Sequence, residues 1–306
     1  MDNLIRSLAK GSVNSALPIR SYLTEFLNKQ DVKNYLRSDR RPWRRGYRLY
    51  RNKYLADALR DVSILNVFRS SEPLPLGYGF RLDARVVEIP WVLTHLQQRS
   101  HSILDAGSSL NFDFVLTAPL MGKKKLTIIT LALESQYHWR LGVPYVFDDL
   151  RRLCFKDDYF DDVVYISTIE HVGMGNSMYA GSCEAAQRGE PHQFILAIKE
   201  LKRVLKPGGA LYCTSPFGEY EDHGWFQQFD SALADILIEA FDPKEHRETI
   251  FRYDPDGWKM GDRASCMHCQ FFDVHKSKYF DHSSKIEYPP DYPAGERAVM
   301  CLELFK

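Results

Sequence analysis

The sequence has no long hydrophobic run and no excess of charge of either sign. No stretch of about 18 apolar residues occurs, so no membrane span is expected. The 306 residues include 40 Lys and Arg and 40 Asp and Glu, so no global field favours a nucleic-acid ligand. The first ten residues are polar and basic and lack a hydrophobic core, so we expect no signal peptide and predict a cytoplasmic protein.

Cysteine is also sparse. The six cysteines are scattered, and only Cys266-Met-His-Cys269 has CxxC spacing. With no second pair at zinc-binding distance, no metal site is expected. Reduced, buried thiols are the better interpretation of the other cysteines. Internal repeats and low-complexity tracts are absent as well, which favours an ordinary globular chain.

The stretch from Ser102 to Asn111, SILDAGSSLN, has the clearest local pattern. A short apolar run ends in an acid, a glycine and small polar residues, and a helical pattern follows. This is typical of a first parallel strand whose carboxyl end borders a binding crevice. Gly107 permits a sharp turn, and small neighbours let backbone amides approach a ligand. A tight turn without a ligand is the alternative interpretation.

Further strands and helices alternate after this stretch. The predicted strands are 102–105, 126–131, 145–147, 162–167, 210–214, 269–274 and 298–305, and the predicted helices are 112–120, 193–205 and 231–241. A further helix is expected from Arg85, with Pro90 near its first turn. Strands separated by helices indicate a parallel sheet, so the predicted fold class is α/β with helices on both faces.

The first 60 residues are helical in pattern and basic, with 14 Lys and Arg against 5 Asp and Glu. Eight of the basic residues lie between Arg37 and Lys53, interleaved with Trp43, Tyr47 and Tyr50. A nucleic-acid site, a pocket for a phosphorylated or otherwise anionic substrate, and a solvated helix face all fit this pattern. We rank nucleic acid last of the three.

Four segments in fixed order resemble class I S-adenosylmethionine-dependent methyltransferases of the type 11-like kind. They are Leu104–Ser108, Asp149–Phe155, Phe160–Gly173 and Glu200–Gly209. Each is common alone, but their order and spacing are specific, and the similarity covers about residues 85–217. The segments Arg41-Pro-Trp43 and Arg85–Glu88 also resemble uncharacterised methyltransferases of sugar or polysaccharide pathways.

The resemblance implies a Rossmann-like, mostly parallel seven-stranded sheet and S-adenosylmethionine as cofactor. It also implies a domain organisation. A helical, basic N-terminal cap or lid would span 1–84, and a methyltransferase domain would span 85–306 with an insertion around 219–296.

Cofactor contacts are expected from the ends of four predicted strands and from one flanking arginine. The residues are Asp105, Ala106, Gly107, Ser108, Ser109, Thr130, Leu131, Glu134, Asp149, Leu150, Ser167 and Arg85. Asp149, with Asp148 as its rival, would lie beside the adenine amino group, and Leu150 would pack on the ring. Arg85 would pair with the methionine carboxylate, or else form an ion pair with Glu88 or Asp83.

Two positions depart from the family pattern. Ser109 and Asn111 replace glycines of the first loop, although their polar groups could hydrogen-bond the methionine end. Thr130 stands where an acid usually binds the ribose, and Glu134 lies one helical turn further on. We favour Glu134 as the replacement; a solvated Glu134 is the alternative.

Methyl transfer from a sulfonium is an in-line displacement, and a hydroxyl acceptor needs a base near neutrality. His171 after the fourth predicted strand is the candidate base or acceptor-orienting group, and a structural histidine is the alternative. Glu170 could orient the imidazole, bind the acceptor or cap a backbone amide. The candidate acceptor contacts are Tyr78, Asn176, Tyr179, Arg45, Tyr47 and His223, with Trp225 and Phe226 as further pocket walls.

The predicted reaction is methyl transfer to oxygen of a small or carbohydrate-like, anionic acceptor. A degenerate methyltransferase fold that serves as a non-catalytic scaffold is the alternative, because of the replaced glycines and Thr130. Aminopropyl transfer ranks lower, since no acidic amine-binding cluster is evident in the sequence. No oligomeric state is predicted.

Overall fold

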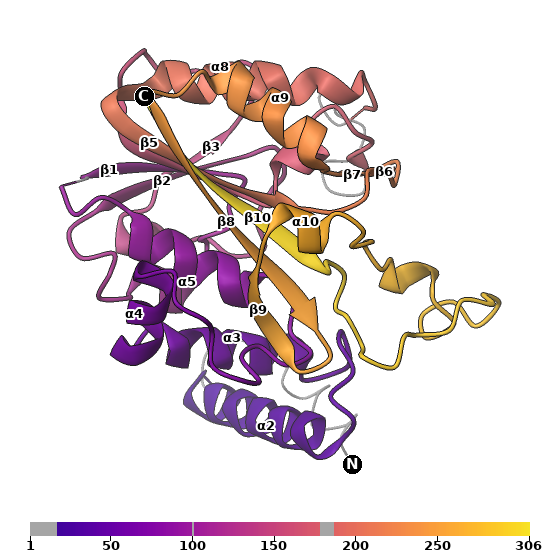
Figure 1. Cartoon of the computed structure of the whole chain (residues 1–306). Helices are drawn as coiled ribbons and strands as arrows, with labels where there is room; N and C mark the ends of the chain where they lie inside the picture. Colours follow the sequence, from indigo (N-terminus) through magenta and orange to yellow (C-terminus); the bar gives the residue numbers. More distant parts are fainter. Residues whose placement is uncertain (1–16, 100, 178–186) are drawn as a thin grey trace.

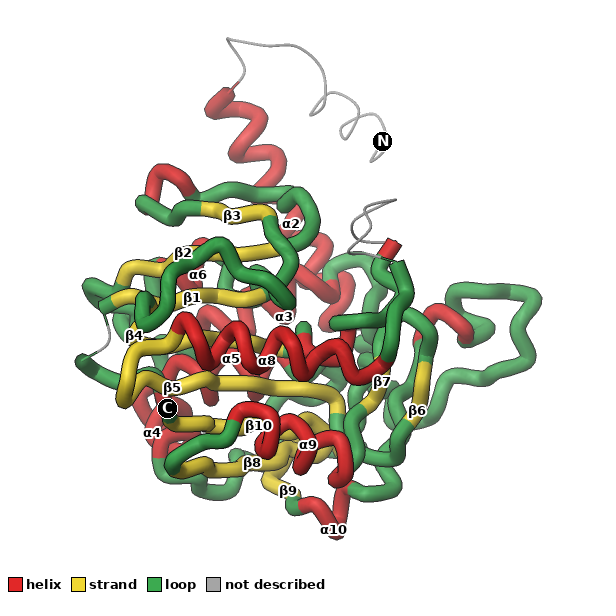
Figure 2. The backbone as a smooth tube through the Cα atoms, turned by 90° about the horizontal axis from the view of Figure 1, so that it is seen from above, coloured by secondary structure: helices red, strands yellow, loops and turns green. Residues whose placement is uncertain are grey.

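A twisted sheet with helices on both faces organises the chain (Figure 1). The computed structural model describes residues 17–99, 101–177 and 187–306. Within them the main sheet has eight strands in the order β3-β2-β1-β4-β5-β10-β8-β9. Figure 2 shows β3 at one edge and the β8–β9 pair at the other.

The first five strands of the sheet are parallel to their neighbours, and the last three pair antiparallel. The strands are β1 Ser102–Ala106, β2 Lys125–Thr130, β3 Tyr145–Phe147, β4 Phe160–Ile166, β5 Leu205–Pro216, β8 Glu245–Asp254, β9 Gly257–Gly261 and β10 Ala298–Phe305. A separate two-stranded sheet joins β6 Glu221–Asp222 and β7 Gln227–Gln228.

Helices cover the two faces separately (Figure 1). One face carries α2 Leu17–Arg37, α3 Tyr47–Ala58, α4 Val62–Arg69 and α5 Arg85–His95, and the other carries α8 Phe194–Val204 and α9 Ser231–Phe241. Short helices are α6 Asp113–Leu116 and α10 Arg263–Cys266, with 3₁₀ turns η1 Trp139–Leu141, η2 Ile169–His171, η4 Pro191–Gln193 and η5 Val274–Lys276.

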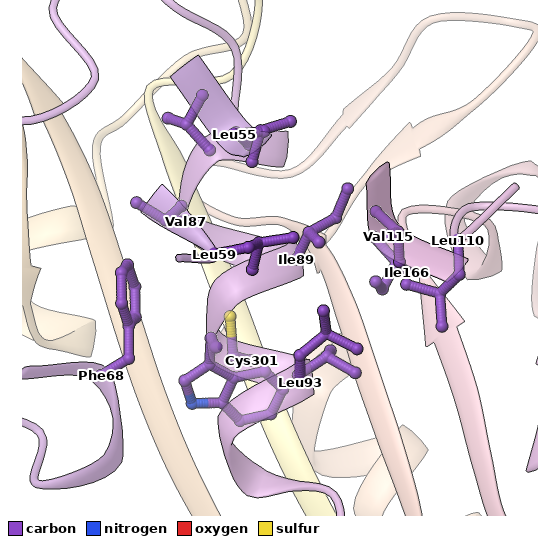
Figure 3. Packing of buried hydrophobic residues seen from close by; sticks show 14 of the residues in the cluster. Leu55, Leu59, Phe68, Val87, Ile89, Leu93, Leu110, Val115, Ile166 and Cys301 are labelled. Carbon is purple, nitrogen blue, oxygen red and sulfur yellow. The ribbon is translucent and has the colours of Figure 1, made fainter. Parts of the chain in front are cut away.

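Helix α5 is the central element of the N-terminal face. Every residue from Val86 to Leu93 is buried, because α5 lies between the sheet and the helices α3 and α4. Figure 3 shows Ile89 and Leu93 of this helix among apolar side chains that include Cys301 of β10. On the opposite face α8 buries residues at helical spacing, including Phe194, Ile198 and Leu201.

Asp side chains fix two helix starts. The carboxylate of Asp61 accepts backbone N–H groups at the start of α4, and that of Asp230 accepts the Leu233 N–H at the start of α9. Such caps satisfy amides that have no partner inside the helix.

The predicted seven-strand sheet is wrong by one strand, and one predicted strand is misplaced. Residues 269–274 form no strand, and the hairpin of β8 and β9 supplies two strands that the pattern did not indicate. The predicted helix 112–120 is wrong in length, because only the four residues of α6 are helical. Pro90 lies inside α5 rather than in its first turn. The α/β class and the mostly parallel order of the first five strands are confirmed.

Among the described residues, no helix has the length and apolar character needed to cross a membrane.

Candidate functional site

A first cavity of 470 Å³ opens at the carboxyl ends of β1, β2 and β4. Its volume falls in the range of about 300–1,000 Å³ typical of small-molecule sites. Nine predicted cofactor residues line it: Arg85, Gly107, Ser109, Thr130, Leu131, Glu134, Asp149, Leu150 and Ser167. Three others do not: Asp105 and Ala106 are buried beneath the loop, and Ser108 faces a second cavity.

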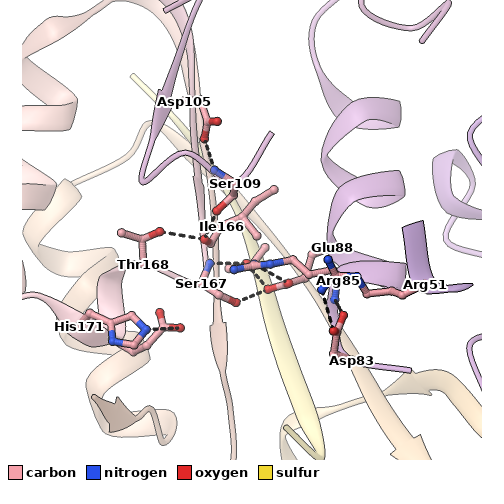
Figure 4. Close-up of polar contacts among 12 residues, drawn as sticks. Arg51, Asp83, Arg85, Glu88, Asp105, Ser109, Ile166, Ser167, Thr168 and His171 are labelled. Atoms are coloured by element: carbon pink, nitrogen blue, oxygen red, sulfur yellow. Dashed lines mark hydrogen bonds and ion pairs between the residues drawn. The ribbon is translucent and has the colours of Figure 1, made fainter. Parts of the chain in front are cut away.

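The loop after β1 is held closed by a buried carboxylate. Asp105 accepts the backbone N–H group of Ser109 at 3.1 Å (Figure 4) and that of Leu110 at 2.8 Å. Burial raises the pKa of Asp105 to about 7, although these hydrogen bonds oppose the shift. Asp105 therefore shapes the loop from below and does not line the first cavity.

Gly107 has a positive φ of 112°, and a Cβ there would lie 2.1 Å from Oγ1 of Thr168. Only glycine permits this crossing of the loop over the end of β4. The Ser109 hydroxyl donates its proton to the carbonyl of Ile166, the last residue of β4, at 2.8 Å. Its oxygen lone pairs are the part of this group left for a ligand.

Asn111 lies in the lining of the second cavity rather than the first. Its amide N–H donates to the Gln136 carbonyl at 3.2 Å, and its Oδ1 accepts the Tyr145 hydroxyl at 2.8 Å. These bonds tie the first loop to the segment between β2 and β3. Both polar groups of the Asn111 amide thus have partners within the chain, and its contact with the methionine end of the cofactor stays a prediction.

Acids gather on the opposite wall of the first cavity. Glu134 lines both cavities, and within the described part of the chain its carboxylate has no hydrogen bond or ion pair. Asp149 is paired with Arg151, whose Nη2 lies 2.6 Å from Oδ2. Burial alone would raise the pKa of Asp149, but the hydrogen bonds from Arg151 lower it below its usual value.

A buried network joins α5 to the ends of β4 and β5. Arg85 donates to Oε2 of Glu88 at 2.9 Å, while the hydroxyls of Ser167 and Thr214 both donate to Oε1 (Figure 4). Glu88 is 1% exposed. Arg85 thus forms the ion pair named as the alternative, yet it also lines both cavities.

His171 ends η2 and lies in the lining of both cavities. Its Nδ1 lies 3.0 Å from the Trp225 carbonyl, which can only accept, so Nδ1 carries the proton and Nε2 is the basic nitrogen. Burial lowers the pKa of His171 to about 4, so the ring is neutral near pH 7.

Glu170 precedes His171 and is 2% exposed. Its Oε1 lies 3.8 Å from Nε2 of His171, beyond hydrogen-bond distance, and its buried Oε2 has no partner among the described residues. Burial raises the pKa of Glu170 well above the usual value. Burial therefore favours the protonated form of this side chain.

The second cavity, of 1,000 Å³, lies between the carboxyl ends of the parallel strands, the basic N-terminal stretch and the segment before β10. Four residues line both cavities: Arg85, Glu134, Ser167 and His171. The two cavities therefore meet at the ends of β4 and α5. Two ligands bound in these cavities would meet at a shared wall that contains a histidine.

The predicted acceptor residues are only partly brought together. Arg45 lines the second cavity and Asn176 lines the first. Tyr47 and His223 line neither: the Tyr47 hydroxyl donates to Asp83, and His223 stacks on Phe226 with ring centroids 4.3 Å apart. Trp225 does line the second cavity, whereas Phe226 belongs to the core. Tyr179 lies outside the described residues.

Tyr78 is also buried away from both cavities, for a specific reason. Pro90 has no N–H to donate to the Val86 carbonyl one turn earlier in α5. The Tyr78 hydroxyl donates to that carbonyl instead, at 2.8 Å. Tyr78 therefore completes the hydrogen bonding of α5.

Several lining residues were missed by the sequence analysis. Thr168 and Arg151 follow recognised strand ends and could have been found from the spacing. Glu296 and Phe271 enter the second cavity from the segment between β9 and β10. Nothing in their local sequence indicates that position, because only the return of the chain to β10 brings them there.

Comparisons with known proteins agree with this geometry. Residues 125–213 match the family model described as a methyltransferase domain. No curated protein matches the chain significantly. This match supports an enzyme that contains a methyltransferase domain.

Similar solved structures are distant in sequence. A Burkholderia thailandensis 1,6-didemethyltoxoflavin-N1-methyltransferase with bound S-adenosylhomocysteine is 15% identical, with a TM-score of 0.44 over 73% of this chain and 79% of that one. A Thermotoga maritima SAM-dependent methyltransferase is 14% identical, with a TM-score of 0.43 over 83% and 99%. One from Archaeoglobus fulgidus is 10% identical, with a TM-score of 0.44 over 80% and 100%. Given these low values, residue roles rest on the site itself.

Proposed function

We propose that the chain transfers a methyl group from S-adenosylmethionine to an oxygen of a small, carbohydrate-like acceptor that carries an anionic group. The observation that carries this proposal is the junction of the two cavities at His171. The donor supplies a methyl group on a positively charged sulfur, which makes the methyl carbon electrophilic.

The lining of the first cavity fits the donor. The turn at Gly107 leaves room where a Cβ would clash. The Glu134 carboxylate, which has no partner among the described residues, suits the ribose hydroxyls. Asp149, held by Arg151, suits the adenine amino group, with Leu150 beside the ring. Arg85 keeps donors beyond the one that it gives to Glu88, and these suit the methionine carboxylate.

His171 is suited to act as the base. Its Nε2 would take the proton of the acceptor hydroxyl as that oxygen bonds to the methyl carbon and the carbon–sulfur bond breaks. The electron pair of the broken bond stays on sulfur. Because the pKa of His171 is about 4, the ring is neutral near pH 7 and can accept this proton. It is a weaker base than an exposed imidazole, so His171 contributes mainly by orienting the acceptor hydroxyl.

The outer rim of the second cavity supports an anionic acceptor. Arg44, Arg45 and Arg48 line it from the basic N-terminal stretch. Arg44 and Arg45 already pair with Asp39 and Asp31. Within the described residues Arg48 has no ion pair and lies over Trp43 at 5.8 Å. We assign to this stretch, and to the helices up to residue 84, the role of a cap over the acceptor.

Calorimetric titration with S-adenosylmethionine and S-adenosylhomocysteine tests the cofactor site. We expect micromolar binding that Asp149→Ala weakens at least tenfold, while Asp157→Ala, an exposed acid paired with Arg203, leaves it unchanged. Formation of S-adenosylhomocysteine with phosphorylated or nucleotide-linked sugars then tests the acceptor class. Absence of binding at millimolar cofactor would contradict the proposal and favour the alternative that the chain is a non-catalytic scaffold.

A further inference from the structure

We propose that Glu170 and Glu296 together bind the hydroxyl groups of a polyol, so the methylated end of the acceptor is an uncharged, sugar-like ring. This inference rests on the proposed function and assigns the part of the acceptor nearest His171. Glu296 has no role in the reaction as derived above.

The two carboxyl groups come from distant parts of the chain to the same wall. Glu170 follows β4, and Glu296 lies two residues before β10. Both line the second cavity together with His171. Their mutual repulsion, with that from Glu88, contributes to the raised pKa of Glu170, so the three groups are close enough to interact.

Glu170 points to a ligand because its Oε2 is buried without a partner among the described residues. Leaving such an oxygen unpaired destabilises the folded chain, because the group has lost its hydrogen bonds to water. A hydroxyl bound at this position would satisfy it. The neighbouring cation, Arg85, pairs with Glu88 at 2.9 Å, and its effect in lowering the pKa of Glu170 and Glu296 is outweighed by burial.

The protonation of the pair favours a hydroxyl over an ammonium ligand. Burial, together with repulsion from Asp83 and Glu88, raises the pKa of Glu296 to about 7, so a large share of the molecules carry a protonated Glu296 near pH 7. A protonated carboxyl both donates and accepts, which matches a hydroxyl group, whereas an ammonium group needs a carboxylate. Two such groups side by side can each hold one of two neighbouring hydroxyls.

The surrounding walls suit a sugar ring. Trp225, Phe112 and Phe271 also line the second cavity. Aromatic faces beside hydrogen-bonding carboxyls give a ring both an apolar face and polar edges to contact. The arginines of the outer rim would then meet the anionic substituent of the same molecule.

Paired substitutions at Glu296 test the inference, with calorimetry on protein saturated with S-adenosylhomocysteine. The probes are glucose 6-phosphate and UDP-glucose as polyols, and ethanolamine phosphate and spermidine as amines. We expect the polyol probes to bind, Glu296→Ala to weaken them at least tenfold, and Glu296→Gln to stay within about threefold. A glutamine amide keeps a donor and an acceptor, as a protonated carboxyl does.

Glu170→Gln should likewise keep polyol binding, and every variant should keep its affinity for S-adenosylhomocysteine. Loss in Glu296→Gln equal to that in Glu296→Ala would overturn the inference, since a negative charge would then be needed. Tighter binding of the amines, or no binding of either polyol, would overturn it too.

The cofactor titration separates this failure from that of the proposed function. Wild-type protein that does not bind S-adenosylhomocysteine contradicts the proposed function itself. Turnover of catechol, a hydroxyl acceptor that is not a sugar, without turnover of either polyol would retain O-methyl transfer and overturn only the polyol inference.

Discussion

Single residues in the first loop carry most of the site geometry. The sequence predicted the turn at Gly107 because a glycine after a short apolar run is a strong local signal. It could not predict that Ser109 donates a hydrogen bond to β4 and that Asn111 donates one to the segment between β2 and β3. Those partners are distant in sequence, so only the folded chain reveals which polar groups are left for a ligand.

Gly107→Ala should cost about 3 kcal/mol of unfolding free energy and weaken S-adenosylhomocysteine binding at least tenfold. The new Cβ meets Thr168 at 2.1 Å, which adds overpacking to the strain of a positive φ. Urea denaturation and calorimetry measure the two effects. Gly142→Ala is the control, because Gly142 has a φ of 75° but nothing within 4 Å of a Cβ. Equal losses in both variants would contradict the crossing argument.

His171 makes the stability depend on pH. Its pKa falls from 6.5 to about 4 on folding because burial disfavours the charged ring. Between these values the unfolded chain binds a proton that the native chain does not, so the unfolding free energy falls as pH decreases from 6.5 to 4. The loss amounts to about 3 kcal/mol.

His171→Asn should lack this pH dependence. As the pH falls from 6.5 to 4, the wild type should lose about 3 kcal/mol of unfolding free energy that the variant keeps. Urea denaturation at several pH values measures the difference. His246→Asn is the control, since His246 is exposed on β8 and should follow the wild type. Parallel pH curves for His171→Asn and the wild type would contradict a neutral, buried ring.

At the scale of elements, α5 anchors the strand ends through one carboxylate. Glu88→Ala should cost about 3–5 kcal/mol, because it leaves Arg85 and two hydroxyls without their buried partner. Glu88→Gln should cost less, since its amide oxygen still accepts. Urea denaturation measures both, and Glu25→Ala, which removes an exposed pair with Lys29, should have no measurable effect. A loss in Glu88→Ala no larger than in Glu25→Ala would contradict this anchoring.

Elements with a strong period were predictable from sequence, and the others were not. Strands β1 to β5 and helices α8 and α9 have continuous apolar runs or helical spacing, because both faces of the sheet are covered. The β8 strand begins with four exposed residues, Glu245–Glu248, so its pattern is weak. The turn before Gly257 was the one available sign of the β8–β9 hairpin.

At the scale of the whole molecule, the zero net charge hides a separation of charge. The basic N-terminal stretch faces the second cavity, opposite the acids of the strand ends. The sequence contains this basic stretch but did not decide whether it binds nucleic acid, binds an anionic substrate or is a solvated helix face. The second cavity supports the proposed anionic small molecule, since arginines of the basic stretch and His171 line the same cavity.

Arg48→Glu should therefore raise the KM for glucose 6-phosphate at least tenfold, with kcat and S-adenosylhomocysteine affinity unchanged. Its guanidinium lies at the rim without an ion pair in the described residues, so charge reversal acts on the phosphate and not on the reacting hydroxyl. Added salt should raise the wild-type KM and reduce the difference in KM between the wild type and Arg48→Glu, because salt screens exposed charges.

The control for Arg48→Glu is Arg247→Glu, which makes the same charge change on β8 at an exposed pair with Glu245. If the N-terminal stretch recognises the anionic group locally, Arg247→Glu keeps the wild-type KM. An equal rise in KM for both variants would instead mean that the total charge of the molecule, rather than the rim of the second cavity, attracts the acceptor. A fall in kcat with an unchanged KM in Arg48→Glu would place the arginine with the reacting groups.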